Sequence, residues 1–160
     1  MRLIAVTNKN ESLGKQLMVT QKQIDDALIL SVPDAIQTAK ETSEKARPFF
    51  IEAENKIVGF TMFAFDEIIE NENYRYWLWQ LMIDKNEQGK GVAKQALPLV
   101  IDYFKNEGVP FITLSTKPNN TPALALYKKF GFIETGEWND TEIILQKKIV
   151  SETKVKNTFV

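Results

Sequence analysis

The chain has 160 residues, 44% of them hydrophobic and 26% charged, with a formal net charge of −1 and neither cysteine nor histidine. This size and balance are typical of one globular domain and give no sign of nucleic acid or membrane as a partner, since no apolar run reaches the ~20 residues that cross a bilayer. The missing histidine and cysteine exclude Ser-His-Asp and Cys-His catalysis, disulfides and the usual zinc sites, so we expect no metal and a cytoplasmic protein.

The first part of the chain is predicted to form a short strand and two helices. Residues 3–7 read as the strand, and residues 10–23 as a helix that shows Leu13, Leu17 and Ile24 on one face. A second helix is expected over residues 31–45, because Pro33 suits a first helical turn. Pro48 would end it. The residues expected to face the core from this helix are Ala35, Ile36, Ala39 and Ala46.

A strand hairpin and an acidic loop follow. Residues 49–53 and 57–65 are expected to pair as strands around a turn at residues 54–56. The loop over residues 66–73 contains no Lys or Arg. Two interpretations stay open for it: an ordinary solvated loop, or a negative field that draws a cationic substrate to the mouth of a cleft. Its acidic residues are Asp66, Glu67, Glu70 and Glu72.

The second half of the chain is predicted to alternate strands and helices. Residues 74–84 are apolar or aromatic at alternate positions on both sides, which favours a strand in mid-sheet with helices over both faces. The next helix contains Pro98, where we expect a bend, and residues 111–116 form the next strand. Strand, helix and strand in this order predict a parallel pair with a right-handed crossover.

The C-terminal region reads as a helix, a hairpin and a tail. Thr121 is expected to cap the helix, with a proline at its first position. Residues 132–137 and 142–148 would pair as a hairpin. We therefore expect a single domain over residues 1–149. Residues 150–160 would form a tail that is either loose or a contact for a partner.

The turn between the central strand and the next helix is the candidate binding loop. Gly89 and Gly91 leave backbone N–H groups bare at a helix start, where they and the helix dipole favour an anion. The alternative is an ordinary strand-to-helix turn. The turn is not a P-loop, because Lys90 is followed by glycine, and it is not a dinucleotide fingerprint, because Lys94 stands where a third glycine belongs.

Two motifs give the chain a family resemblance. The first is Gln-x-x-Gly-x-Ala over residues 88–93, and the second is Asn-x-x-Ala-x-x-Leu-Tyr-x-x-x-Gly-Phe over residues 120–132. With this order of elements, the chain resembles the GNAT family of acetyl-CoA-dependent N-acetyltransferases over residues 1–149. Within the family, residues 77–84 look most similar to bacterial spermine/spermidine (diamine) acetyltransferases.

The resemblance implies an α/β fold of GNAT type. We expect a mixed central sheet of about seven strands that is splayed between the fourth and fifth strands and flanked by about four helices. The backbone of the fourth strand would bind the pantetheine arm of acetyl-CoA, and the glycine turn its pyrophosphate. Asn120 would bind the arm as well, unless it only caps its helix. The implied contacts are Leu81, Met82, Ile83, Gln88, Gly89, Lys90, Gly91, Val92, Ala93, Lys94 and Asn120.

The resemblance also implies a catalytic phenol. Tyr127 would protonate the departing CoA thiolate; as an isolated residue it reads better as a core aromatic, but its place in the second motif favours the acid. Relatives that acetylate polyamines often carry a carboxylate in the central strand, where this chain has Trp79. The base is therefore open between Glu67 or Glu70 acting through water, backbone carbonyls, and bulk solvent. Trp77 and Trp79 either pack in the core or line a cationic substrate by cation–π contact.

The predicted function is transfer of an acetyl group from acetyl-CoA to a primary amine by direct attack in a ternary complex. A small polyamine such as spermidine or spermine is the first candidate acceptor, because of the acidic loop. The alternatives are an aminoglycoside, an amino acid or a protein N-terminus as the acceptor, or a CoA-binding regulatory module without turnover. A homodimer is a candidate assembly.

Overall fold

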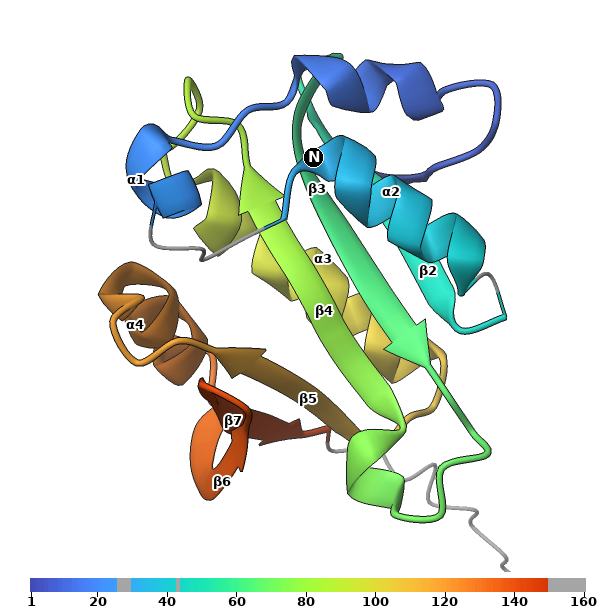
Figure 1. Ribbon diagram of the computed structural model, residues 1–160, viewed down its shortest axis with the longest axis vertical. Coiled ribbons are helices and arrows are strands. Elements are labelled where there is room, and N and C mark those ends of the chain that lie inside the picture. Colours follow the sequence, from blue (N-terminus) through green and yellow to red (C-terminus); the bar gives the residue numbers. More distant parts are fainter. Residues whose placement is uncertain (26–29, 43, 150–160) are drawn as a thin grey trace, which may run out of the picture.

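The computed structural model describes residues 1–25, 30–42 and 44–149. These residues form a seven-stranded sheet of order β1-β2-β3-β4-β5-β7-β6 with helices against both faces (Figure 1). The tail predicted over residues 150–160 lies outside the described residues. None of the helices in the described part is long and apolar enough to cross a membrane.

The strands account for most of the predicted elements. They are β1 (Arg2–Ala5), β2 (Ala46–Ala53), β3 (Lys56–Phe65), β4 (Tyr76–Ile83), β5 (Phe111–Thr116), β6 (Ile133–Asn139) and β7 (Glu142–Lys148). The helices are α1 (Gln21–Asp25), α2 (Val32–Glu41), α3 (Val92–Asn106) and α4 (Thr121–Lys129), with the 3₁₀ turns η1 (Glu11–Gln16) and η2 (Glu72–Tyr74).

The sheet is antiparallel except between β4 and β5. Those two strands, both fully described, run parallel and pair at a single register position, Trp77 with Thr113. Beyond that position they separate, as Figure 1 shows between β4 and β5. The mixed sheet, its splay between the fourth and fifth strands and its flanking helices confirm the predicted fold.

Helices α2 and α3 cover opposite faces of the sheet. The buried residues Leu97 and Phe104 of α3 belong to the same cluster as Leu78 of β4. Ile36 of α2 belongs to a second cluster, which includes Met82 of β4. β4 is therefore covered on both sides, as predicted, and its backbone is held in position by two separate hydrophobic cores.

The helix predicted over residues 10–23 is wrong in part. The structure has η1, then an extended segment, then the five-residue α1, and Leu13 and Ile24 are exposed while Leu17 is buried. The Met18 N–H donates to the Asp84 carboxylate at 2.8 Å, and the Met18 carbonyl accepts from the Lys85 N–H. This backbone is bonded to the turn after β4, so it is not available for a continuous helix.

The predicted end of the second helix is also wrong. Helix α2 ends at Glu41, and both Ala46 and Pro48 belong to β2. The Pro48 carbonyl accepts from the Val6 N–H, so the nitrogen of Pro48 faces the β1 side of β2. A proline at this position therefore removes no ladder bond to β3. On the other side of β2, the strand β1 has already ended at Ala5.

Candidate active site

The cleft begins at a β-bulge in β4. Gln80 lies opposite Met62, and the next pair joins Leu78 to Phe63, so Trp79 has no partner in β3. An extra residue reverses the side-chain alternation of a strand. For that reason Leu78 and Met82 belong to different hydrophobic clusters, and Trp79, for which core packing was one of two predicted roles, is 42% exposed.

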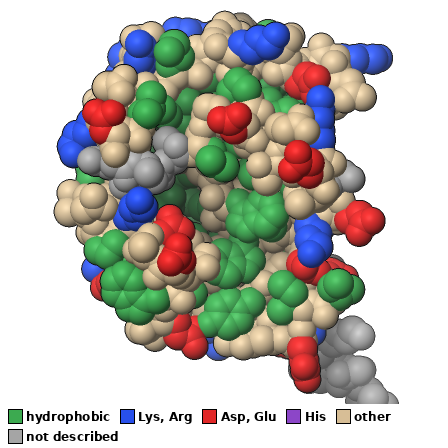
Figure 2. Space-filling model, viewed as in Figure 1, with side chains coloured by type: hydrophobic (Ala, Val, Ile, Leu, Met, Phe, Trp, Pro, Cys, Tyr) green, Lys and Arg blue, Asp and Glu red, His purple; other side chains and the backbone are tan. Residues whose placement is uncertain are grey.

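A cleft of about 710 Å³ opens where β4 and β5 separate. Figure 2 shows a hollow in this face of the molecule, with hydrophobic side chains gathered below it. The lining residues come from β4 (78–83), the next turn and α3 (87–89, 91–94), the end of β5 (115, 116), the start and inner side of α4 (120, 122, 123, 126, 127), and Gln23, Leu30 and Glu142.

The glycine turn forms one end of the cleft. Gly89 and Gly91 have φ values of 77° and 78°, and Gly91 is the N-cap of α3 without a side-chain cap bond. A Cβ at Gly89 would meet nothing within 4 Å, and one at Gly91 would only reach the Gln95 amide nitrogen at 4.0 Å. Open space over bare amides at the start of a 15-residue helix is the geometry that favours an anion.

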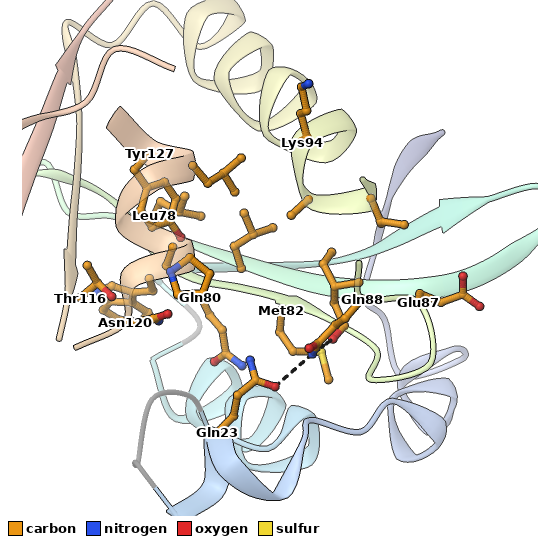
Figure 3. Close-up of a pocket in the computed structure, with 18 of the residues that line it drawn as sticks. Gln23, Leu78, Gln80, Met82, Glu87, Gln88, Lys94, Thr116, Asn120 and Tyr127 are labelled. Carbon is orange, nitrogen blue, oxygen red and sulfur yellow. Dashed lines mark hydrogen bonds between the residues drawn. The ribbon is translucent and has the colours of Figure 1, made fainter. Parts of the chain in front are cut away.

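The polar side chains of the turn are already engaged. The Gln88 amide nitrogen donates to the Gln23 side chain and to the Ile83 carbonyl, both at 3.0 Å. Figure 3 shows the first of these bonds crossing one side of the cleft. Lys90 lies outside the lining and pairs with Glu87 at 3.4 Å. The stronger hydrogen bond from Lys56 to Glu87 lowers the pKa of that carboxyl.

Lys94 lines the cleft and has a second lysine as a neighbour. The neighbouring, positively charged Lys94 lowers the pKa of Lys129, which lies on α4. Figure 3 shows the Lys94 ammonium directed away from the middle of the cleft. Two adjacent ammonium groups repel each other, and an anion bound beside them would relieve the repulsion.

Tyr127 lies beside the cleft on α4 and is buried. Burial raises the pKa of its phenol to about 12. Figure 3 shows the hydroxyl directed into the cleft, with Met82 and Gln80 between it and Gln88. Among the described residues none forms a side-chain hydrogen bond with this hydroxyl. The phenol is therefore protonated at neutral pH and faces the cleft.

Asn120 and Thr121 differ from their predicted capping roles. The N-cap of α4 is Asn120, and Thr121 is the first helical residue, so the predicted cap is displaced by one position. The Asn120 side chain makes no cap bond and lines the cleft. Two roles were predicted for Asn120, helix capping and contact with a ligand. Since the side chain makes no cap bond, its amide remains available for the second role.

The predicted substrate-side residues are not all brought together. Trp79 lines the cleft, and Trp77 lines a smaller adjoining cavity of about 240 Å³. Glu67 and Glu70 line neither cavity, and their loop precedes β4 while the glycine turn follows it (Figure 1). The sequence reasoning missed Gln23, Gln80 and Glu142. Only Gln80 had a signal, as a polar residue inside an apolar strand.

The site combines a parallel strand pair that separates, a turn of bare amides at one end and a protonated phenol beside the opening. Backbone amides can hold a diphosphate and an open strand edge can hold an extended amide chain, and CoA contains both of these groups. The fold and the site thus define an acyltransferase of the type that uses a CoA thioester.

Comparison with known proteins agrees with this class. Residues 19–132 match the model of the Acetyltransferase (GNAT) family. The "Probable spermine N(1)-acetyltransferase" of Bacillus subtilis subsp. natto is 36% identical over 83% of this chain and 88% of its own length. The "Spermine/spermidine N(1)-acetyltransferase" of Bacillus subtilis is 35% identical over the same shares.

A solved structure shows the same fold. The PaiA N-acetyltransferase of Thermoplasma acidophilum in complex with coenzyme A superimposes with a TM-score of 0.64 at 13% identity, over 93% of this chain and 100% of that one. The chain belongs to the GNAT family, and it is an acetyl-CoA-dependent N-acetyltransferase.

Proposed function

We propose that this chain transfers the acetyl group of acetyl-CoA to a primary amine of a small polyamine, within a ternary complex. A polyamine acceptor is supported by sequence identity: the chain is 36% identical, over 83% of its length, to a protein named as a probable spermine acetyltransferase. The observation that carries the chemistry is that Tyr127 and the glycine turn line one cleft.

The cleft has the size and the wall chemistry for the CoA arm. Its volume of about 710 Å³ is within the usual range of ligand pockets. The edge of β4 over Leu81, Met82 and Ile83 has no partner in β5, so its backbone is available for an extended amide chain. The diphosphate would lie on the amides that follow Gln88, and Asn120 would bind the arm.

In the proposed reaction the amine nitrogen attacks the thioester carbonyl carbon, a C–N bond forms and the C–S bond breaks. The nitrogen gives up one proton to water, and the sulfur leaves as a thiolate that takes one proton from Tyr127. With a pKa of about 12 the phenol is protonated at neutral pH, so it has a proton to donate. Solvent then restores the phenol. The chain's own contribution is thus positioning and one proton transfer.

The test measures release of free CoA from acetyl-CoA with spermidine for the wild type and Tyr127→Phe. We expect kcat to fall about 10²-fold or more, the usual range for loss of a general acid, with little change in either KM. Thermal unfolding of both proteins checks that the substitution leaves the fold intact. Equal kcat values would remove Tyr127 from the chemistry.

A panel of acceptors decides the substrate. It contains spermidine, spermine, an aminoglycoside, free amino acids and a peptide with a free N-terminus. The polyamines should give the highest kcat/KM. A higher value for another amine would replace the proposed acceptor, and no CoA release with any of them would favour a CoA-binding regulatory module.

A further inference from the structure

A second cavity adjoins the cleft and shares part of its wall. This cavity, of about 240 Å³, is lined by Trp77, Asn139 and four residues that also line the cleft. The four shared residues are Leu78, Trp79, Ser115 and Glu142. Because the two spaces meet at these side chains, an acceptor that occupies the smaller cavity has a direct route to a thioester in the larger one.

Glu142 is the one carboxylate among the four shared residues. It is the first residue of β7 and is half-buried. The Ser115 hydroxyl donates to its Oε2 at 2.9 Å, which fixes the carboxylate against the end of β5. Within the described residues, the Glu142 side chain accepts a hydrogen bond from this hydroxyl and forms no salt bridge. The second oxygen is left for a cation.

Trp79 belongs to the same shared lining as this carboxylate. The bulge in β4 places Trp79 at the surface with 42% of its area exposed. Trp77 is fixed in the smaller cavity by a hydrogen bond from its indole N–H to the Tyr74 carbonyl at 2.8 Å. Aromatic faces attract ammonium groups, and a carboxylate fixed in the same lining adds a full negative charge. This combination selects a cationic chain over a neutral one.

We propose that Glu142 binds an ammonium group of the acceptor at the junction of the two cavities, with Trp79 as part of the wall. The proposal rests on the proposed function, which supplies the thioester in the larger cleft. It assigns the acceptor class as an amine with a second positive charge, because one nitrogen must be neutral to attack while another can remain bound to the carboxylate. Ser115 acts as a positioning residue for Glu142.

The test is steady-state kinetics of Glu142→Gln with spermidine and acetyl-CoA. We expect KM for spermidine to rise about 10- to 100-fold, the usual effect of losing a hydrogen bond to a charged group, with kcat and KM for acetyl-CoA unchanged. The increase should be smaller for a monoamine acceptor. Ser115→Ala should raise KM for spermidine less than Glu142→Gln does.

The matched control is Glu137→Gln. Glu137 lies on the partner strand of the same hairpin, is exposed and lines neither cavity. Its substitution removes the same charge and should leave KM for spermidine unchanged. Equal increases in both variants would show a general charge effect and overturn the proposal. A fall in kcat with unchanged KM for spermidine would also overturn it, by placing Glu142 in the chemical step.

Failure of the proposed function is distinguishable. If the wild type releases no CoA with any amine, calorimetric titration of spermidine into the wild type and Glu142→Gln, each saturated with CoA, still tests the site. Weaker binding in Glu142→Gln alone supports the acceptor site without turnover. Equal affinities, or no binding to the wild type, would reject it.

Discussion

The buried phenol of Tyr127 makes the stability of the protein sensitive to alkaline pH. Its pKa is about 12 in the folded chain, against an ordinary value of 10.0 that holds once the chain unfolds. Below pH ~10 the phenol is protonated in both states, and its contribution to stability is fully present. Between pH ~10 and ~12 the unfolded chain ionises first, so the free energy of unfolding falls as pH rises.

The magnitude follows from the two pKa values. A difference of about 2 units corresponds to about 2.7 kcal/mol once pH exceeds both values, and to about 1.4 kcal/mol at pH 11. The assay is urea denaturation at pH 8 and pH 11, followed by tryptophan fluorescence, for the wild type and Tyr127→Phe. Other groups titrate equally in both proteins, so the difference between the two isolates Tyr127.

The expected result is a wild type that loses about 1.4 kcal/mol more than Tyr127→Phe between the two pH values. Parallel losses would mean that the folded phenol ionises near its ordinary pKa and is therefore hydrated. That outcome would refute the argument that burial keeps the proton on Tyr127. It would leave the proposed proton transfer in place, because a phenol with an ordinary pKa is still protonated at neutral pH.

Two further substitutions test the turn and the bulge. Gly91→Ala should destabilise the fold by about 1–2 kcal/mol, because φ is 78° there, and it should also raise KM for acetyl-CoA. The control is Gly136→Ala, where φ is 82° but the residue lies outside the cleft. Thermal unfolding should show the same destabilisation for this control, and kinetics should show an unchanged KM for acetyl-CoA. Thr61→Val should lower the free energy of unfolding, measured by urea denaturation, by about 1–3 kcal/mol, because the buried hydroxyl donates to the Gln80 carbonyl at 2.8 Å. Thr61→Ser should keep that hydrogen bond and most of the stability.

The parts of the fold that the sequence predicted correctly depend on local signals. The turn at Glu54 and Asn55 was identified by its residues, and both have positive φ as a tight hairpin requires. The strand, crossover helix and strand from β4 to β5 followed from hydrophobic periodicity, and their parallel pairing from the length of the connection. The resemblance that the two motifs carry implied that the glycine turn and Tyr127 serve one site, and both line the same cleft in the structure.

The parts that were missed depend on contacts between distant residues. The extended segment after η1 is set by the bond between Met18 and Asp84, which are 66 positions apart. Glu142 reaches the cleft because β7 pairs with β5, and nothing in the local sequence of a polar hairpin distinguishes it from Glu137. The resemblance led us to look for a carboxylate at position 79, where the chain has a tryptophan. It gave no reason to look for one at position 142, on a different strand.

The bulge at Trp79 connects these findings. One unpaired residue turns Gln80 toward the α1–α2 side, where its amide nitrogen donates to the Leu30 carbonyl at 3.0 Å. Trp79 lies two residues beyond Trp77, which is the single position of β4 that pairs with β5, and the two strands separate in this region. The edge of β4 after the bulge is then open toward the cleft, while Trp79 itself lines the wall shared with the smaller cavity. A single irregularity in one strand therefore lies where the cleft opens, and it supplies the wall against which the proposed acceptor would bind.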